Sequence, residues 1–263
     1  MTTTIALAGK GGTGKTTVAA MVIKYLMLNQ KEAILAIDAD PSANLNMVLG
    51  LELGWTVGEI RENLLEKVKQ SVSAGGAAMG SVSGGMSKHD YLDYEIHTSL
   101  VESERFDLIA MGRSEGPGCY CAVNHNLREI MDNLSQNYRY VVVDNEAGME
   151  HLSRRTTNDV DHLFVISDPT QRGMTAAERI ARLKDELDIE VKNTYLILNR
   201  LPGAIPPALQ ERIDEIGIPF LGTIPADDTL TNFEFSGKPL IELSLDSPVY
   251  QAVSEMLEKT LDV

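Results

Sequence analysis

Residues 9–16 read Gly-Lys-Gly-Gly-Thr-Gly-Lys-Thr and satisfy the pattern G-x-x-x-x-G-K-[ST]. Glycines in such a loop let backbone N–H groups approach phosphate oxygens without a clash from a Cβ atom. The charge of Lys15 would neutralise the β and γ oxygens, and the Thr16 hydroxyl would be a ligand of Mg²⁺. Because an expected strand precedes this loop and an expected helix follows it, the pattern predicts binding of a nucleoside triphosphate with Mg²⁺.

Two further segments place aspartates directly after apolar runs. Asp38 and Asp40 belong to Asp-Ala-Asp-Pro-Ser-Ala-Asn, and Asp144 begins Asp-Asn-Glu-Ala-Gly, which fits D-x-x-x-G. An acidic residue at the end of a strand is often only a helix N-cap, so each aspartate alone is a weak signal. Together with the glycine-rich loop, they indicate carboxylates beside the phosphates.

The chain has two cysteines, Cys119 and Cys121, which are separated by a single residue. A disulfide between them would close a very small ring, which the geometry of the bond disfavours. A buried pair is an alternative, since free cysteine often behaves as a small hydrophobe. However, the flanking Gly-Pro-Gly and Asn-His-Asn favour a turn. Two thiolates are half of a four-sulfur site, so the C-x-C pattern predicts a metal whose other ligands come from elsewhere.

The elements that would position these residues alternate between short apolar runs and segments of helical period. Strands are expected at Thr4–Ala8, Ala33–Asp38, Leu108–Met111, Tyr140–Asp144, His162–Ser167, Asn193–Asn199 and Phe220–Ile224. Helices are expected at Thr16–Asn29, Leu127–Asn137, Thr175–Leu187, Pro207–Ile216 and Pro248–Leu261. This order predicts an α/β fold with a doubly wound, mainly parallel sheet of about seven strands, helices on both faces and ligands at the carboxyl ends of the strands.

The length, composition and charge of the chain limit the classes of protein to which it can belong. With 263 residues, of which 43% are hydrophobic, the chain is expected to form a single domain over residues 1–263. Residues 68–93 are rich in glycine and serine and are expected to form a mobile insertion. The net charge of −15 argues against nucleic-acid binding through a basic face. Without a signal peptide or a membrane-length apolar run, the sequence predicts a cytoplasmic protein with no stable membrane anchor.

The glycine-rich loop resembles the P-loop variant of the MinD and nitrogenase-iron-protein ATPases. In that family a lysine at the position of Lys10 crosses a dimer interface to the nucleotide of the partner. The resemblance implies that Asp40 positions the attacking water and that Asp38 orients this water or the Mg²⁺ shell. It also implies that Asp144 holds a magnesium-bound water and that the N–H of Gly148 senses the γ-phosphate.

Recognition of the base rests on the same resemblance. Asn199 matches a family asparagine that reads the adenine edge, and Ile224-Pro225-Ala226-Asp227 resembles the base-contacting loop that follows. An asparagine at a strand end is otherwise an ordinary turn former. The expected catalytic residues are Lys10, Lys15 and Asp40. The expected contacts of ATP or ADP and Mg²⁺ are Gly9, Lys10, Gly11, Gly12, Thr13, Gly14, Lys15, Thr16, Thr17, Asp38, Asp144, Gly148, Asn199, Arg200 and Pro225.

The C-x-C segment narrows the resemblance to the CooC proteins, which are accessory ATPases for nickel insertion into carbon monoxide dehydrogenase. Met111-Gly112-Arg113 and residues 144–151 also match, and the resemblance covers essentially the whole chain. It implies a homodimer that forms on ATP or metal binding, with carbon monoxide dehydrogenase or a related nickel enzyme as its client. Because a twofold axis pairs a segment with itself, Cys119 and Cys121 of two chains would offer four thiolates to one Ni²⁺ or Zn²⁺.

Other assignments stay open at this point. An iron–sulfur protein of the nitrogenase-iron-protein type is an alternative, because four cysteines suit a cluster equally well. A partition or positioning ATPase acting on DNA or membrane is disfavoured by the acidic segment Ser254–Val263. His125 is expected to be a surface or cap residue, since a lone histidine is a weak metal signal. No metal role is expected for His89, His97, His151 or His162.

Overall fold

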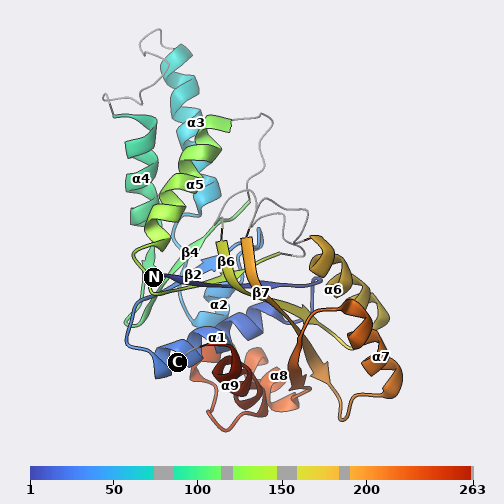
Figure 1. The fold of residues 1–263 in the computed structure, drawn as a ribbon. Coiled ribbons are helices and arrows are strands. Elements are labelled where there is room, and N and C mark those ends of the chain that lie inside the picture. Colours follow the sequence, from blue (N-terminus) through green and yellow to red (C-terminus); the bar gives the residue numbers. More distant parts are fainter. Residues whose placement is uncertain (74–85, 114–120, 147–158, 184–189, 262–263) are drawn as a thin grey trace.

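The computed structural model describes residues 1–73, 86–113, 121–146, 159–183 and 190–261. These residues form an eight-stranded sheet in the order β3-β4-β2-β5-β1-β6-β7-β8 (Figure 1). The strands are β1 (Thr3–Ala8), β2 (Ile34–Asp38), β3 (Val101–Glu102), β4 (Phe106–Ala110), β5 (Tyr140–Asp144), β6 (Asp159–Ser167), β7 (Glu190–Leu201) and β8 (Phe220–Pro225). All pairs are parallel except β3–β4, so the predicted doubly wound α/β sheet is confirmed.

The seven strands expected from the sequence are all present, with ends that differ by a few residues. The additional strand, β3, pairs antiparallel with β4 through two residues at the edge of the sheet. A two-residue strand is too short to show any alternation of apolar and polar side chains, so the pattern could not have revealed it.

Helices cover both faces of the sheet. They are α1 (Lys15–Asn29), α2 (Leu45–Leu49), α3 (Val57–Ser73), α4 (Lys88–Ser99), α5 (Cys121–Ser135), α6 (Gln171–Leu183), α7 (Pro207–Ile216), α8 (Asp228–Phe235), the 3₁₀ turn η2 (Leu240–Glu242) and α9 (Pro248–Thr260). Alternation along β1 divides the core between the faces. Ile5 and Leu7 belong to the cluster that packs with α1 and α9, whereas Ala6 and Ala8 belong to the cluster that packs with α3, α5 and α6.

Helix α1 is buried on nearly all sides. Its residues from Val18 to Leu26 are buried, and it contacts β5, α2, η2 and α9. Gly14 precedes α1 with φ 89°, a left-handed conformation that lets the chain turn sharply from the loop into the helix. The amino end of α1 is therefore held firmly beside the loop formed by residues 9–14.

The parallel register aligns the two aspartate-bearing strands. Asp38 at the end of β2 is the direct neighbour of Asp144 at the end of β5, and Leu7 of β1 is the neighbour of Asp144 on its other side. The carboxyl ends of all three strands lie side by side, and the glycine-rich loop begins at the carboxyl end of β1. The predicted carboxylates thus lie next to one another at the carboxyl ends of the strands, as the topology requires.

Helices α3, α4 and α5 pack against one another and extend away from the sheet (Figure 1). Tyr91, Leu92 and Ile96 of α4 are buried in the same cluster as Ile60 and Leu64 of α3. Residues 68–73 and 88–93, the two ends of the segment predicted as an insertion, are therefore helical. Residues 74–85, between them, lie outside the described residues.

The first turn of α3 contacts the backbone that follows β4. Gly58 N donates a hydrogen bond of 2.9 Å to Met111 O. A Cβ atom on Gly58 would lie 2.0 Å from Arg113 O and 3.2 Å from Met111 O, so α3 can approach this segment only with glycine at position 58.

Replacing Gly58 with alanine should therefore destabilise the protein, although alanine is the better helix former by about 1 kcal/mol. We expect Gly58→Ala to lower the free energy of unfolding by about 1–3 kcal/mol, because α3 must move away from residues 111–113. Urea denaturation would measure the change. Gly54→Ala is the matched control, since a Cβ atom there meets nothing within 4 Å. Equal stabilities of the two variants would contradict this packing.

Candidate functional site

The loop between β1 and α1 is closed by hydrogen bonds to a single carbonyl. Lys10 O accepts from Thr13 N at 3.3 Å, from Thr13 Oγ1 at 2.9 Å and from Lys15 Nζ at 3.5 Å. Thr13 is buried, and Gly12 adopts φ 81°. The loop is thus already curled, as binding of phosphate oxygens by consecutive N–H groups requires.

Two glycines are needed because other segments approach the loop closely. A Cβ atom on Gly9 would lie 2.2 Å from Ile166 O, and one on Gly14 would lie 2.3 Å from Asn199 Nδ2. The loop therefore packs directly against the end of β6 and against β7. By contrast, a Cβ atom on Gly11 would meet nothing within 4 Å. Position 11 is therefore exposed and not restricted by a neighbouring segment.

Lys15 is the buried cation of the site, with 7% of its surface exposed. Burial lowers the pKa of its ammonium group, and the nearby carboxylates of Asp144, Asp40 and Glu146 oppose this change. A phosphate chain in the loop would give this poorly solvated ammonium group a negatively charged partner.

Asp144 is a buried carboxylate, with 1% of its surface exposed. Burial raises its pKa to about 7, while a hydrogen bond from the Thr16 side chain and the charge of Lys15 act in the opposite direction. Its Oδ1 atom is buried and has no hydrogen-bond partner among the described residues. A hydroxyl and a carboxylate in contact are the hard oxygen ligands that Mg²⁺ prefers. Thr16 and Asp144 therefore fit an Mg²⁺ site with its bound water.

Asp38 organises the loop that follows β2. Its Oδ1 accepts from Asp40 N at 3.1 Å and its Oδ2 from Leu45 N at 2.8 Å, so both oxygens are bound to backbone N–H groups. Burial raises the pKa of Asp38 to about 6 in spite of these bonds. Asp40 Oδ1 accepts from Ser42 N at 2.8 Å, and this side chain is only half-buried. Asp40 is thus the more accessible carboxylate of the pair.

Asn145 is a residue of this site that the sequence reasoning did not single out. It is 1% exposed, and both its backbone N and its Nδ2 donate to Leu7 O, at 3.2 and 2.9 Å. It joins the end of β5 to the end of β1, immediately before the glycine-rich loop. Its position next to Asp144 was the one signal available, because an amide that follows a buried strand often bonds to backbone.

The end of β7 is bonded to the loop from the other side. Asn199 Nδ2 donates to Thr13 O at 2.7 Å, and Arg200 NH1 donates to Gly12 O at 3.0 Å. Asn199 Oδ1 accepts from Arg200 N at 2.9 Å, and Arg200 has φ 58°. In this state the Asn199 side chain holds the loop, so reading a base edge would require it to exchange these bonds.

A small pocket lies between the first turn of α1, the ends of β7 and β8, and α8. Its volume is about 120 Å³. The residues that line it are Thr17, Val18, Asn199, Arg200, Pro225, Ala226, Asp227, Asp228, Leu230, Thr231, Glu234 and Val249. The expected contacts Thr17, Asn199, Arg200 and Pro225 are thus brought together around one pocket next to the loop.

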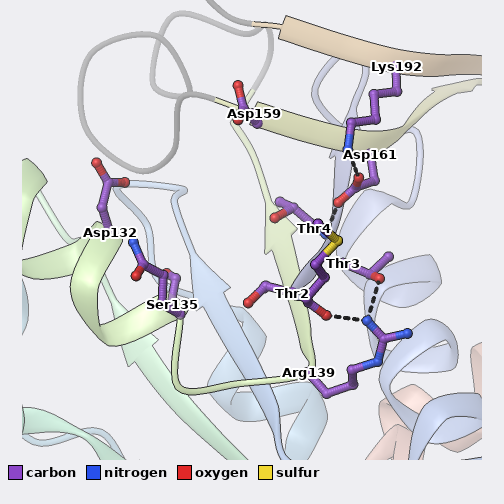
Figure 2. Close-up of a pocket in the computed structure, with 11 residues that line it drawn as sticks. Thr2, Thr3, Thr4, Asp132, Ser135, Arg139, Asp159, Asp161 and Lys192 are labelled. Atoms are coloured by element: carbon purple, nitrogen blue, oxygen red, sulfur yellow. Dashed lines mark hydrogen bonds and ion pairs between the residues drawn. The ribbon is translucent and has the colours of Figure 1, made fainter.

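A larger pocket of about 580 Å³ lies at the amino ends of the strands, away from the glycine-rich loop (Figure 2). Asp161 on its wall accepts from Thr4 N and from Lys192 Nζ, both at 2.7 Å. Arg139 donates to Met1 O and lies 3.4 Å from Thr3 Oγ1. These charges bond to neighbouring chain segments, so they stabilise the start of the sheet.

Several predicted residues fall outside the described ranges. Cys119 and Gly148 are among them, and the side chain of Cys121 also lies outside, although its backbone begins α5. Within the described part of the chain, no group of three or more His, Cys, Asp or Glu side chains is arranged to hold a metal ion. His125 is exposed on α5. In the same ranges, no helix is long and apolar enough to cross a bilayer.

Comparison with known proteins agrees with this geometry. Residues 4–240 match the family described as the CobQ/CobB/MinD/ParA nucleotide binding domain. An uncharacterized ATP-binding protein of Methanocaldococcus jannaschii is 42% identical over 262 residues, covering 98% of both chains. The carbon monoxide dehydrogenase accessory protein CooC of Rhodospirillum rubrum is 29% identical over 248 residues, covering 91% of this chain and 90% of its own. The fold is similar to that of the septum site-determining protein MinD from Pyrococcus horikoshii in complex with Mg-ADP, with a TM-score of 0.68, 21% identity and coverage of 100% and 97%.

The raised pKa of Asp144 predicts a pH-dependent stability. Between its ordinary pKa of 3.8 and about 7, the folded state binds more protons at this site than the unfolded state, so its contribution to stability falls as pH rises through this window. The Asp144→Asn variant has no carboxyl group at this position, so it does not lose stability there as pH rises. Without Mg²⁺ and nucleotide, we expect the variant to gain stability over wild type from pH 4 to pH 7, by on the order of 1–4 kcal/mol.

Denaturation curves at pH 4, 6 and 8 would measure this difference. The exposed Asp246→Asn is the control for the loss of one carboxylate elsewhere. A stability difference between Asp144→Asn and wild type that is the same at pH 4 and pH 8 would contradict the assignment.

Proposed function

We propose that this chain, which belongs to the family of CobQ/CobB/MinD/ParA nucleotide-binding domains, couples ATP hydrolysis to the insertion of nickel into carbon monoxide dehydrogenase or a related nickel enzyme. The chain is a P-loop ATPase, as its family and its ATP-binding relative indicate. The client and the metal are the proposed part. The C-x-C pattern at residues 119–121 carries this proposal, together with the likeness to a CooC protein over nine-tenths of both chains.

In the proposed mechanism the glycine-rich loop and Lys15 bind the phosphates of ATP. Thr16 and Asp144 would hold Mg²⁺, which neutralises charge on the β and γ oxygens when bound. Asp40 is the accessible carboxylate of its loop and would orient the water that attacks the γ-phosphate. Asp38, whose oxygens are both bonded to backbone, would keep Asp40 in place. The proposed roles of Asp40 and Asp38 thus follow from the exposure of the first and the hydrogen bonds of the second.

Lys10 contributes its carbonyl to the loop, and its ammonium group has no hydrogen-bond or ion-pair partner among the described residues. This supports the proposal that the ammonium group acts on the nucleotide of a second copy of the chain. Two copies related by a twofold axis would then exchange lysines, and each site would be complete only in the dimer.

The backbone that precedes the cysteine segment is joined to the nucleotide site by a hydrogen bond at Met111. Met111 N donates to Asp38 O at 2.8 Å, and the chain then proceeds towards Cys119 and Cys121. A rearrangement around Asp38 on ATP binding or hydrolysis would therefore act on the start of this segment. We propose that closure of the dimer assembles four thiolates around the ion and that hydrolysis releases it. The amino end of α5, which begins at Cys121, would favour the thiolate form.

A mixing experiment tests the shared nucleotide site. We expect Lys10→Gln and Asp40→Ala each to abolish most hydrolysis while retaining ATP binding. In mixed dimers one site receives both intact residues, because Lys10 comes from one chain and Asp40 from the other. Since half of the dimers are then mixed and each has one complete site, activity should recover to about a quarter of wild type.

The control mixture combines Lys15→Ala with Asp40→Ala, whose residues act in the same chain, so no complete site can form. Phosphate release would be measured for each mixture, and dimer composition would be checked with two affinity tags. If the first mixture does not recover activity in dimers shown to be mixed, the proposal that Lys10 acts on the nucleotide of the other chain is wrong.

Metal analysis tests the proposed metal site formed by Cys119 and Cys121 of two chains. We expect one Ni²⁺ or Zn²⁺ per dimer in wild type and an affinity lower by orders of magnitude in Cys119→Ser and Cys121→Ser, because serine hydroxyls hardly ionise. ATP binding should survive in both variants, since other segments form the nucleotide site. His125→Ala, which removes a potential ligand four residues after Cys121, is the matched control and should keep the metal. One ion per chain would rule out the shared site, and bound iron with sulfide would favour the iron–sulfur alternative.

A further inference from the structure

Asn145 joins the end of β5 to the end of β1 through both its main chain and its side chain. Its backbone N donates to Leu7 O at 3.2 Å, and its Nδ2 donates to the same oxygen at 2.9 Å. A carbonyl oxygen has two lone pairs, so Asn145 occupies both acceptor positions of Leu7. The side-chain bond has the usual length of an N–H···O bond, whereas the backbone bond is at the long end of the range. The side chain therefore makes the better of the two bonds.

This side-chain bond lies where the pairing of β5 with β1 ends. The last paired residue of β5 is Asp144, which is the direct neighbour of Leu7. On the other side, Ala39 N donates to Asp144 O at 2.9 Å. The main chain around Asp144 is thus held from β1 by Asn145 and from the loop after β2 by Ala39.

Asp144 needs this restraint because neighbouring charges act on its carboxylate. The negative charges of Asp38 and Asp40 raise its pKa, and the hydrogen bond from the Thr16 side chain acts in the opposite direction. If the main chain could move, repulsion would drive the carboxylate away from its place beside Thr16. A fixed main chain keeps this ligand in position before the ion arrives, so the ion does not have to order it.

The other half of the Asn145 amide shows that the residue adds little to folding. Its Oδ1 is buried and has no hydrogen-bond partner among the described residues. Burial of an unpaired amide oxygen destabilises the folded state and offsets the gain from the Nδ2 bond. Leucine has nearly the same shape as asparagine and would remove the penalty together with the bond. The contribution of the amide should therefore appear at Asp144 and not in the stability of the free protein.

We propose that Asn145 is a positioning residue for Mg²⁺, which acts by holding the main chain of Asp144 through its Nδ2 bond to Leu7 O. Outer partners that orient a metal ligand typically change metal affinity by about 10- to 100-fold when they are lost. The inference rests on the proposed Mg²⁺ site at Thr16 and Asp144. It is independent of the proposed nickel site, so metal analysis of the cysteine variants does not decide it.

The test measures the Kd of ADP by calorimetry, once with saturating Mg²⁺ and once with EDTA. The ratio of the Kd in EDTA to the Kd in Mg²⁺ reports the contribution of the ion. In Asn145→Leu we expect this ratio to fall by about tenfold from the wild-type value. The Kd in EDTA should change by less than about threefold, because Asn199 still holds the loop through Thr13 O. The urea midpoint of the ligand-free variant should stay close to that of wild type.

Asn193→Leu is the matched control. Asn193 Nδ2 also donates to a main-chain carbonyl, Asp161 O at 3.1 Å, but at the amino ends of the strands. This variant should keep the wild-type ratio. Asp144→Ala removes the proposed ligand itself and should bring the ratio close to one. Asn145→Ser, which has a shorter polar side chain, repeats the test if the leucine variant does not fold.

The outcomes separate this inference from its premise. A wild-type ratio in the Asn145 variants, with a reduced ratio in Asp144→Ala, would overturn the inference and leave the proposed Mg²⁺ site intact. Equal weakening of ADP binding with and without Mg²⁺ in Asn145→Leu would mean that Asn145 only shapes the loop, which also overturns it. A wild-type ratio in Asp144→Ala, or a ratio of one in wild type, would remove the proposed Mg²⁺ site and the inference with it.

Discussion

Two carboxylates buried on neighbouring strands set the constraint on which the site depends. The parallel register places Asp38 directly beside Asp144, and burial raises the pKa of both. Negative charges removed from water repel each other unless cations or donors compensate them. Lys15, the Thr16 hydroxyl and two backbone N–H groups provide part of this compensation. A divalent cation would provide the rest, so the unfavourable arrangement of the free protein favours Mg²⁺.

The glycine-rich loop is held from two sides by groups that do not belong to it. Asn145 bonds twice to the carbonyl of Leu7, just before the loop begins, and Asn199 bonds to Thr13 within it. Both asparagines are buried and follow from the strand order, in which β5 and β6 flank β1 and β7 follows β6. The shape of the loop therefore depends on the carboxyl ends of several neighbouring strands. Because β6 and β7 approach the loop closely, glycine is needed at the two positions where they do so.

Much of this organisation was predictable from the sequence, because it rests on patterns that local chemistry determines. The strands that form the centre of the sheet are apolar runs, and the glycine-rich loop has few structural alternatives. The helices α3 and α4 were not predicted: the end of α3 and the start of α4 were assigned to the insertion at residues 68–93, and the remainder of each helix was not assigned to any element. Yet Thr56 and Glu59 form a capping pair at the start of α3, and Ser87 caps α4, so local signals were present. The hydrogen bond between the side chains of Thr17 and Glu234 could not be predicted, because 217 positions separate the two residues and no sequence periodicity links them.

The link between Asp38, Met111 and Gly58 consists entirely of main-chain groups: Met111 N bonds to Asp38 O, and Met111 O accepts from Gly58 N. Every residue except proline carries these groups, so exchange of the Met111 side chain for another apolar one leaves both bonds intact. Evolution can therefore vary the core around position 111 without disconnecting α3 from the aspartate loop. The vulnerable point is Gly58, where any side chain would separate the two backbones. Divergent relatives can therefore change the side chains of α3 while keeping the same main-chain connection to the aspartate loop.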